Sequence, residues 1–407
     1  MKIAMKTLDK LGYVGRGKSK HRPRDASHLY DGPYPFIQTS DVKNAGLYIT
    51  SYSQTYSAAG LAQSKLWNTG TLCITIAANI ADTSILSFDA CFPDSIIGFI
   101  PNSEKADARY IKYLFDNVLQ KRFKRFTQGS AQDNLSQEKL LSLKLPVAED
   151  VQDQIIIADK IALYDQLIDN NRRRIQLLEE SARLLFREWF VYFRFPGHEK
   201  VKIVKDGIRK IPEGWTYTPI TKVKIFKKAP LGVPVFTDTR QYYQTSEIDG
   251  TSITGEGEEV DFENRPSRAN ITPRLNTVYF AKMKDTDKVL CFNKCNADLL
   301  EKILLSTGMV GFTTEEKNLG FLYGVLTSYE FKEYTNIYAT GATQVSLNET
   351  SLGKIRVLIP KPELIEAYSE TVNPILEECA LIRKQNQKLA QARDLLLPRL
   401  MSGAIKV

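Results

Sequence analysis

The chain has 407 residues, of which 43% are hydrophobic and 25% charged, a balance typical of a globular protein and not of a disordered or fibrous one. Its 55 Lys and Arg against 47 Asp and Glu give a formal charge of +8, which favours a polyanionic partner such as nucleic acid. The sequence has no apolar run long enough for a membrane span and no apolar core of a secretion signal near its start, and its five cysteines suit a reducing compartment, so a cytoplasmic protein is expected.

The first third of the chain alternates short apolar runs of β character with turn residues. Leu72–Ile76 and Ile96–Ile100 are two such runs. A helical pattern over Tyr110–Leu119 interrupts them, and Ser136 is a good N-cap for a further short helix. The region up to about Pro146 is therefore predicted to be an α+β unit with mixed short strands.

The same order of signals returns about 210 residues later. Gln38-Thr39-Ser40-Asp41 returns as Gln244-Thr245-Ser246-Glu247, and the Gly-x-x-Gln motif of 129–135 returns in 341–347. A second unit is expected from about Trp215 to Pro360, with a helix near 319–331 and with Asn348 in the place of Ser136. The chain therefore contains two copies of one design.

A helical period follows each copy. Apolar residues recur every seven positions, and polar Asn171 and Gln385 occupy equivalent positions in this heptad, where they could fix the register between two helices. Asp159 is expected to cap the first long helix, and Pro374, preceded by Asn373, to begin the second. The residues predicted to set the helix register are Ile168, Asn171, Ile175, Ile382, Gln385 and Leu389.

The order of unit, helix, unit, helix favours antiparallel packing of the two helices, with the C-terminus returning beside the first unit. The predicted fold is α+β, with two similar domains separated by two long antiparallel coiled-coil helices in a circular pseudo-twofold arrangement. The predicted segments are a first domain at 1–148, a helical spacer at 149–195, a linker at 196–214, a second domain at 215–361 and a C-terminal helical spacer at 362–407.

Motifs for catalysis are weak in this sequence. Gly12–Ser19 matches the phosphate-loop pattern G-x-x-x-x-G-K-[ST], but Pro23 and the surrounding charges are unsuited to the helix that must follow such a loop. Cys291 and Cys295 have no second ligand pair, and the three histidines are not spaced to complete a metal site. The sequence therefore predicts no catalytic residues and no metal site.

Basic and hydrogen-bonding segments are the candidates for contact with nucleic acid. Lysines and arginines suit phosphates, and Gln, Ser and Thr can pair with base edges. The alternatives are solvated turns, a helix C-terminus for 121–125, and caps and turns for the repeated motifs. The candidates are Arg16, Lys18, Lys20, Arg22, Arg24, Gln38, Thr39, Ser40, Lys43, Lys121, Arg122, Lys124, Arg125, Gln132, Gln244, Thr245, Ser246, Arg265, Arg268, Arg274, Thr343 and Gln344.

The ordered set of motifs resembles the specificity (S) subunit of Type I restriction-modification enzymes. The resemblance rests on the doubled layout, the Gln-Thr-Ser-acid and Gly-x-x-Gln motifs, and Leu185–Phe193 followed by Pro212-Glu213-Gly214-Trp215. It covers essentially the whole chain. One departure is that the first copy begins almost at Met1, without the Pro-Glu-Gly-Trp segment that precedes the second.

The resemblance implies a non-enzymatic reader of double-stranded DNA, in which each unit is a target recognition domain for half of a split site. It also implies two methyltransferase subunits docked on the helices, and restriction subunits in the full complex. S-adenosylmethionine, ATP and Mg²⁺ would belong to those partners, so no cofactor is expected here. The alternatives are a protein-binding assembly scaffold and a stand-alone DNA-binding protein.

Overall fold

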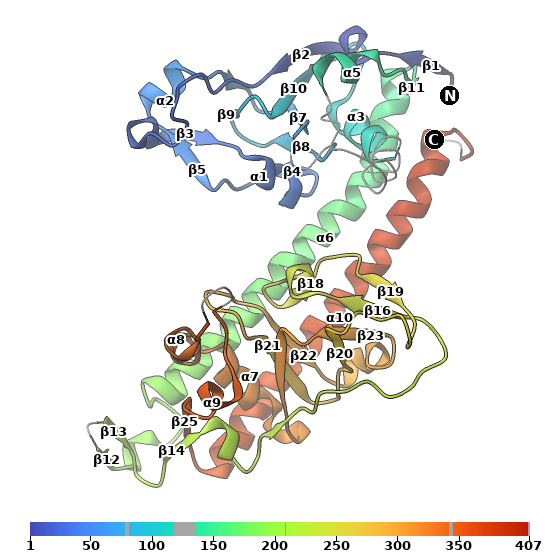
Figure 1. Cartoon of the computed structure of the whole chain (residues 1–407). Coiled ribbons are helices and arrows are strands. Elements are labelled where there is room, and N and C mark those ends of the chain that lie inside the picture. The colour runs from blue at the N-terminus through green and yellow to red at the C-terminus, as the bar shows by residue number, and fades with distance from the viewer. Residues whose placement is uncertain (78–80, 118–135, 208, 342–344, 406–407) are drawn as a thin grey trace. The chain divides into compact units, whose positions relative to one another are not determined.

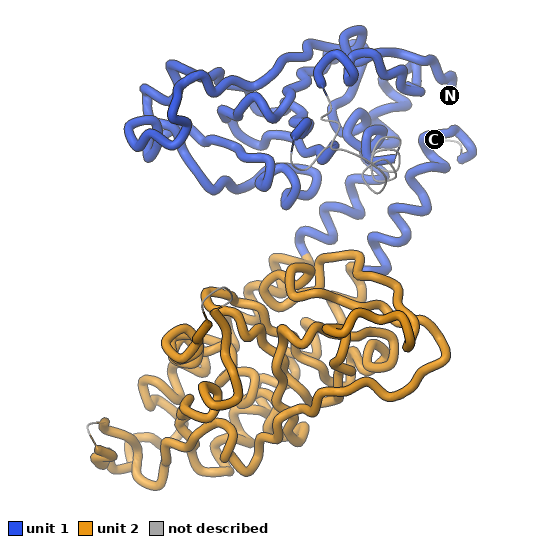
Figure 2. The backbone as a smooth tube through the Cα atoms, viewed as in Figure 1, with its two compact units in different colours: residues 1–170, 387–407 blue, residues 171–386 orange. Residues whose placement is uncertain are grey.

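The structure is a computed structural model that describes residues 1–77, 81–117, 136–207, 209–341 and 345–405. The chain forms two compact units (Figure 2). Unit 1 contains Met1–Asn170 and Gln387–Val407, and unit 2 contains Asn171–Asn386. The C-terminal segment thus joins the N-terminal unit, as the sequence predicted. The division into recognition domains, linker and spacers stays a prediction, because the boundaries between the two compact units fall within the two long helices.

The described residues of unit 1 form two main sheets and a separate strand pair (Figure 1). The five-stranded sheet has the order β2 (Gly12–Arg16), β10 (Ile96–Pro101), β7 (Leu72–Thr75), β8 (Thr83–Leu86) and β4 (Tyr48–Ile49). The four-stranded sheet has the order β5 (Gln54–Tyr56), β3 (Tyr30–Phe36), β9 (Ala90–Cys91) and β6 (Leu66–Trp67). The strand pair is β1 (Ile3–Lys6) with β11 (Leu145–Ala148).

Unit 2 contains two four-stranded sheets and three strand pairs. One sheet has the order β15 (Lys227–Lys228), β24 (Met309–Thr313), β21 (Thr277–Ala281) and β22 (Val289–Phe292). The other has the order β19 (Glu258–Val260), β16 (Arg240–Tyr243), β23 (Ile303–Ser306) and β20 (Ala269–Ile271). The pairs are β14 (Thr216–Pro219) with β25 (Arg356–Ile359), β12 (Ile203–Asp206) with β13 (Arg209–Pro212), and β17 (Ile248–Asp249) with β18 (Ser252–Ile253).

The two units repeat one topology, as the sequence predicted. The parallel pair β3–β9 in unit 1 corresponds to the parallel pair β16–β23 in unit 2. In the other sheet, β10 pairs antiparallel with both β2 and β7, and β24 pairs antiparallel with both β15 and β21. Fully buried runs such as Leu72–Thr75 and Thr277–Ala281 form the centre of these sheets, because both of their faces are covered.

Short helices occupy matching positions in the two units. Ser136 Oγ accepts a hydrogen bond from Lys139 N at 3.1 Å and caps α5 (Gln137–Ser142). Asn348 Oδ1 accepts one from Ser351 N at 2.8 Å and caps α9 (Glu349–Leu352). Both caps confirm the prediction from sequence, since each supplies a partner to an amide that the first turn leaves unpaired.

The helix predicted near 319–331 is instead two helices. The chain forms α7 (Leu319–Thr327) and then α8 (Tyr329–Tyr338), with Ser328 between them. Ser328 has extended backbone angles, and its side chain accepts a hydrogen bond from Phe331 N. A serine in this conformation ends one helix and caps the next, which periodicity alone does not reveal. In unit 1, α3 (Ala108–Phe115) is capped by Asp107 and confirms the predicted helix as far as Phe115, while the predicted residues 118 and 119 lie outside the described residues.

The predicted starts of both long helices are wrong. The first, α6 (Val151–Phe186), starts well before Asp159. At this start, Asp150 Oδ1 accepts a hydrogen bond from Gln152 N at 2.8 Å. The second, α10 (Pro362–Met401), begins at Pro362 and continues through Pro374. A proline does occupy the first turn, where it is well suited, but it is Pro362. The turns before Pro374 bury Ile365, Tyr368 and Val372, and this burial offsets the cost of an internal proline.

Within each unit, segments of α6 and α10 pack antiparallel. In unit 1, Ile157 and Ile161 of α6 belong to the same core as Leu397 and Leu400 of α10. In unit 2, Ile175 packs with Cys379 and Ile382. Asn171 is buried and donates from Nδ2 to Asn386 Oδ1 at 2.8 Å and to Gln385 Oε1 at 3.5 Å. The expected polar contact is present, but Asn386 is the nearer partner.

Candidate nucleic-acid interface

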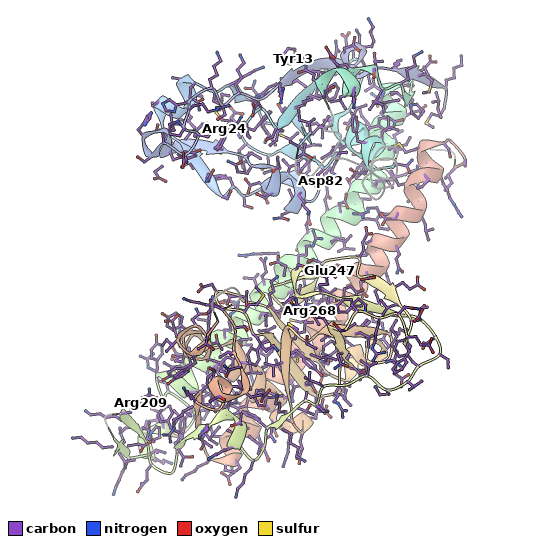
Figure 3. All side chains as sticks on the ribbon, viewed as in Figure 1. Tyr13, Arg24, Asp82, Arg209, Glu247 and Arg268 are labelled. Atoms are coloured by element: carbon purple, nitrogen blue, oxygen red, sulfur yellow. The ribbon has the colours of Figure 1, made fainter. Side chains whose placement is uncertain are left out.

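The basic loop after β2 is held in place by contacts within unit 1. Arg16 Nε donates to the carbonyl oxygen of Asp94, and Arg24 Nη2 lies 3.0 Å from both Asp94 carboxylate oxygens. Figure 3 labels Arg24 in unit 1. Arg22 Nη1 donates to the carbonyl oxygens of Ser19 and His21, each at 2.8 Å. Lys18 and Lys20 are exposed. Asp94 therefore orders the loop, while the two lysines present their charge to solvent.

The phosphate-loop pattern has no phosphate-loop structure. Residues 12–16 form strand β2, and residues 17–26, all of them described, contain no helix. A Cβ at Gly17 would lie 2.3 Å from the carbonyl oxygen of Pro93, so glycine is required by close backbone packing. A phosphate loop needs a helix directly after the glycine, because the first amides of that helix hold the phosphate. Residues 17–26 do not form this helix, in line with the sequence argument against a nucleotide site.

An aromatic and cationic cluster beside this loop was missed from the sequence. Tyr13 is 55% exposed, and Lys65 Nζ lies 4.5 Å from its ring centroid and 3.7 Å from that of Trp67. Lys65 Nζ also donates to Tyr13 Oη at 3.2 Å. The alternation along β2 would have placed Tyr13 on an outward face, but only the tertiary fold brings Lys65 to it, because Lys65 precedes β6 of the other sheet. An exposed ring with an ordered cation is suited to contact with nucleic acid.

The two Gln-Thr-Ser-acid motifs are capping boxes. Asp41 Oδ2 accepts a hydrogen bond from Gln38 N at 2.8 Å at the start of α1 (Thr39–Asn44). Glu247 Oε2 accepts one from Gln244 N at 2.8 Å at the start of the 3-10 turn Thr245–Glu247. The acid is thus repeated because it satisfies the first free amide of each turn. These bonds support the alternative that the motif maintains the fold.

Several groups of these motifs already have partners. Gln38 Nε2 donates to Gln54 Oε1 at 2.8 Å, and Thr245 O accepts from Lys288 Nζ at 2.7 Å. Thr39 is partly buried, and Gln244, Ser40, Ser246 and Lys43 are exposed. Base contact by these residues stays a prediction.

The three predicted arginines of unit 2 differ in environment. Arg265 is folded back on the domain, with its guanidinium 4.1 Å from the Phe262 ring centroid. Arg268, which is labelled in Figure 3, and Arg274 are exposed. Arg268 is the better candidate for phosphate contact, because its backbone is fixed by a 2.9 Å hydrogen bond from Thr307 N. The candidates Lys121, Arg122, Lys124, Arg125, Gln132, Thr343 and Gln344 lie outside the described residues.

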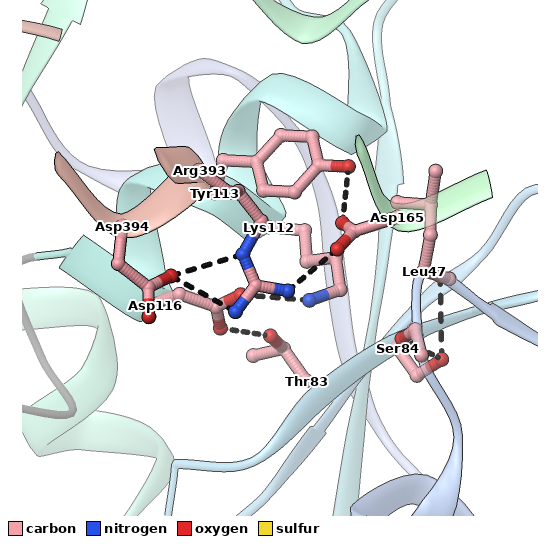
Figure 4. Close-up of polar contacts among 10 residues, drawn as sticks. Leu47, Thr83, Ser84, Lys112, Tyr113, Asp116, Asp165, Arg393 and Asp394 are labelled. Atoms are coloured by element: carbon pink, nitrogen blue, oxygen red, sulfur yellow. Dashed lines mark hydrogen bonds and ion pairs between the residues drawn. The ribbon is translucent and has the colours of Figure 1, made fainter. Parts of the chain in front are cut away.

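Acidic groups in unit 1 form internal ion pairs (Figure 4). Asp165 of α6 accepts hydrogen bonds from Tyr113 Oη at 2.7 Å and from Arg393 Nη1 of α10 at 2.6 Å. Burial, together with the charge of Asp165, raises the pKa of Tyr113, so the phenol stays a neutral donor. Lys112 Nζ donates a hydrogen bond to Asp116 Oδ2 at 2.7 Å, and Thr83 Oγ1 donates one to Asp116 Oδ1 at 2.8 Å. Both acids are thus engaged in joining helices to each other and to the sheet.

The corresponding contact in unit 2 uses different residues. Arg383 of α10 donates to Glu179 of α6 at 2.5 Å. It also donates to Thr251 Oγ1 at 2.7 Å and Ser252 Oγ at 3.1 Å, beside the β17–β18 pair. Among the residues that the structure describes, no group of three or more His, Cys, Asp or Glu could hold a metal ion. No described helix has the length and apolar character that crossing a membrane requires.

Comparison with known proteins gives a consistent class. Residues 4–180 match the family model described as "Type I restriction modification DNA specificity domain". The chain is 23% identical to the type I restriction enzyme MjaIX specificity subunit of Methanocaldococcus jannaschii, over 99% of this chain and 93% of that protein. It is 25% identical to the HindI specificity subunit of Haemophilus influenzae, over 65% of this chain and 69% of that protein.

A solved structure shares the fold. The crystal structure of the S subunit of a type I system from M. genitalium matches with a TM-score of 0.54 at 14% identity, over 98% of this chain and 96% of that one. The fold is shared with this S subunit, and the matched domain is described as a DNA specificity domain. Residues 4–180 thus match the DNA specificity domain of Type I restriction-modification systems, and the chain is similar over nearly its whole length to a specificity subunit, in agreement with the resemblance. Subunits of this family recognise DNA and are not catalytic.

Proposed function

We propose that this chain reads a two-part sequence in double-stranded DNA, one part with each unit. The observation that supports this most directly is the repeat itself. The two units share the order and pairing of their sheets apart from the extra strand β4 in unit 1, yet their exposed polar residues differ, as with Lys18 and Lys20 in unit 1 and Arg268 and Arg274 in unit 2. A shared scaffold with different surfaces suits two readers of different half-sites, in which cations position the protein and base contacts specify the sequence.

The chain would act with two methyltransferase subunits and, in a complete system, restriction subunits, in the cytoplasm. The outer face of α6 supports the docking of a protein partner. In unit 1, Ile156 and Leu163 lie seven residues apart and are 40% and 65% exposed, and in unit 2, Leu177 and Leu184 lie seven residues apart and are 54% and 41% exposed. An exposed apolar stripe on an otherwise charged helix is a feature of interaction surfaces. S-adenosylmethionine, ATP and Mg²⁺ would then be bound by those subunits.

Mapping DNA methylation in cells with and without this gene tests the function. We expect a gapped, two-part motif that is modified only when the gene is present. An uninterrupted motif would favour a different kind of reader, and an unchanged methylation pattern would contradict the proposal.

The salt dependence of DNA binding separates this function from that of a protein scaffold. Affinity for duplex DNA should fall by at least about 10³-fold between 50 and 200 mM salt if six or more phosphates are contacted. A flat response would favour the scaffold.

Replacing Leu163 and Leu177 with Glu tests the docking surface. Co-purification with the methyltransferase should disappear, while Gln176→Glu, at an exposed position about 100° around the same helix from Leu177, should leave it intact. Normal co-purification of the double variant would contradict this surface.

A further inference from the structure

The strand register shows which residues of the two units are equivalent. In unit 1, Phe99 stands opposite Val14 of β2 and Leu72 of β7. In unit 2, Phe312 stands opposite Lys228 of β15 and Val278 of β21. Lys228 therefore corresponds to Val14. By the same register the residue after β7 is Ile76, and the residue after β21 is Lys282.

The shared fold does not need these two lysines. Ile76 is buried in the core of unit 1, and Val14 packs against that core. At the same two positions unit 2 carries positive charge. Because the two units keep the same strand order and pairing, the lysines are not required to build the sheet.

A single turn fixes the backbone around Lys282 and Arg268. In the turn between β23 and β24, Thr307 N donates to Arg268 O, and Gly308 O accepts from Lys282 N, both at 2.9 Å. On its other side, Lys282 O accepts from Leu347 N at 2.9 Å. Leu347 is a described residue that follows the predicted Gly-x-x-Gln motif in the chain.

The positive charges around Lys282 repel one another when no anion is bound. Lys282 is partly buried, and burial, followed by the charge of Lys228, lowers its pKa, with Arg268 adding to the effect. Glu349 opposes this lowering, but its carboxylate is bound to Lys228 Nζ. Three cations and one carboxylate leave a net positive charge, and a bound anion would relieve the repulsion.

We propose that Lys228, Lys282 and Arg268 form a binding site for a backbone phosphate of DNA in unit 2, and that unit 1 has no counterpart at the equivalent positions of Lys228 and Lys282. This inference rests on the proposed DNA-reading function. A phosphate fits because its oxygens accept charge-assisted hydrogen bonds from both lysines and arginine. The site gives unit 2 affinity that does not depend on base sequence, because a phosphate contact positions the protein without reading bases.

The test converts the unit 2 pair into the unit 1 pair. The chain carrying Lys228→Val and Lys282→Ile is compared with wild type for binding to its target duplex and to an unrelated duplex over a range of salt. The matched control is Lys227→Gln, because Lys227 is the exposed neighbour whose side chain points to the opposite face of β15. Lys282→Gln is a second variant that keeps a polar side chain.

The double variant should bind both duplexes about tenfold more weakly, with a salt slope that is smaller by about 0.9 for each phosphate that the variant no longer binds. The methylated consensus should not change, and the control should resemble wild type. The melting temperature should not fall, since a partly desolvated charge has been removed.

Unchanged affinity and salt slope in both Lys282 variants would overturn the phosphate site while leaving the DNA-reading function intact. If the Lys282 variants bind DNA normally but no longer support methylation, the phosphate site is overturned as well. The cluster would then be assigned to contact with a protein partner. If wild-type binding itself does not depend on salt, the proposed function fails together with the site.

Discussion

Unit 1 and unit 2 share their sheets but differ in how their sheets are joined to the helices. In unit 1, Asp165 of α6 bonds to Arg393 and to Tyr113 of α3. In unit 2, Glu179 of α6 bonds to Arg383, which also holds Thr251 and Ser252. In both units the acid lies on α6 and the base on α10. Both units thus join α6 to α10 through an acid and a base, but the further polar residues that these two groups contact differ between the units.

The same division applies to the surface. Val14 and Ile76 complete an apolar core in unit 1, whereas Lys228 and Lys282 stand at the equivalent positions of unit 2. Internal repetition therefore provides a comparison within one chain. Residues that differ between structurally equivalent positions are the ones free to acquire a separate role, because the fold tolerates both choices.

The largest expected effect is at the ion pair of unit 2. Glu179→Ala leaves Arg383 without its buried partner and should destabilise unit 2 by about 3 kcal/mol. Thermal unfolding followed by circular dichroism measures this destabilisation. Glu180→Ala is the control, since Glu180 forms an exposed pair with Arg183 and should change stability by less than about 1 kcal/mol. Equal effects of the two substitutions would contradict the assigned role.

A smaller effect is expected at the corresponding pair of unit 1. Asp165→Asn keeps an acceptor for Tyr113, and Arg393 keeps its 2.9 Å pair with Asp394, so a destabilisation of about 1–2 kcal/mol is expected in thermal unfolding. The control is Asp159→Asn, which alters an exposed acid of the same helix. An effect as large as that of Glu179→Ala would remove the predicted difference between the two units.

The polar contact between the helices should affect specificity more than stability. Asn171→Leu removes the donor to Asn386 and should change stability by about 1 kcal/mol while allowing other registers or associations. Light scattering coupled to gel filtration would detect the new species. Asn170→Ala, at an exposed neighbouring position, should remain like wild type. A uniform species for Asn171→Leu would show that other contacts set the register.

The smallest effects concern the thiols. Burial raises the pKa of Cys379 to about 12, and burial also raises the pKa of Cys73 in unit 1. Native alkylation near pH 8 should label the partly exposed Cys295 first and Cys73 last, as read by mass spectrometry. Because the unfolded thiols ionise near pH 9 and the folded ones do not, the unfolded state gains stability above that pH. The stability of the folded chain should therefore decline as pH rises above about 9. Rapid labelling of Cys73 in the folded chain would contradict its burial.

Prediction from sequence was reliable wherever the signal was local and repeated. Ser136 and Asn348 were identified as caps because the N-cap requirement depends on one residue and the turn after it. The buried stripe of Ile161, Ile168 and Ile175 followed from a period of seven. Of the candidate site, the exposed Lys18, Lys20, Arg268 and Arg274 could be selected from charge, but their contacts could not.

Length, heptad spacing and internal repetition by themselves determined that the chain is an α+β protein made of two related units with long helices, because each of these depends on neighbours along the chain. Only the tertiary structure decided that α10 begins at Pro362, that Asp41 and Glu247 close capping boxes, and that Lys228 and Lys282 replace Val14 and Ile76. The physical reason is that helix ends, capping and charge clusters depend on what packs against a residue, and pairing between strands brings together residues that no periodicity relates.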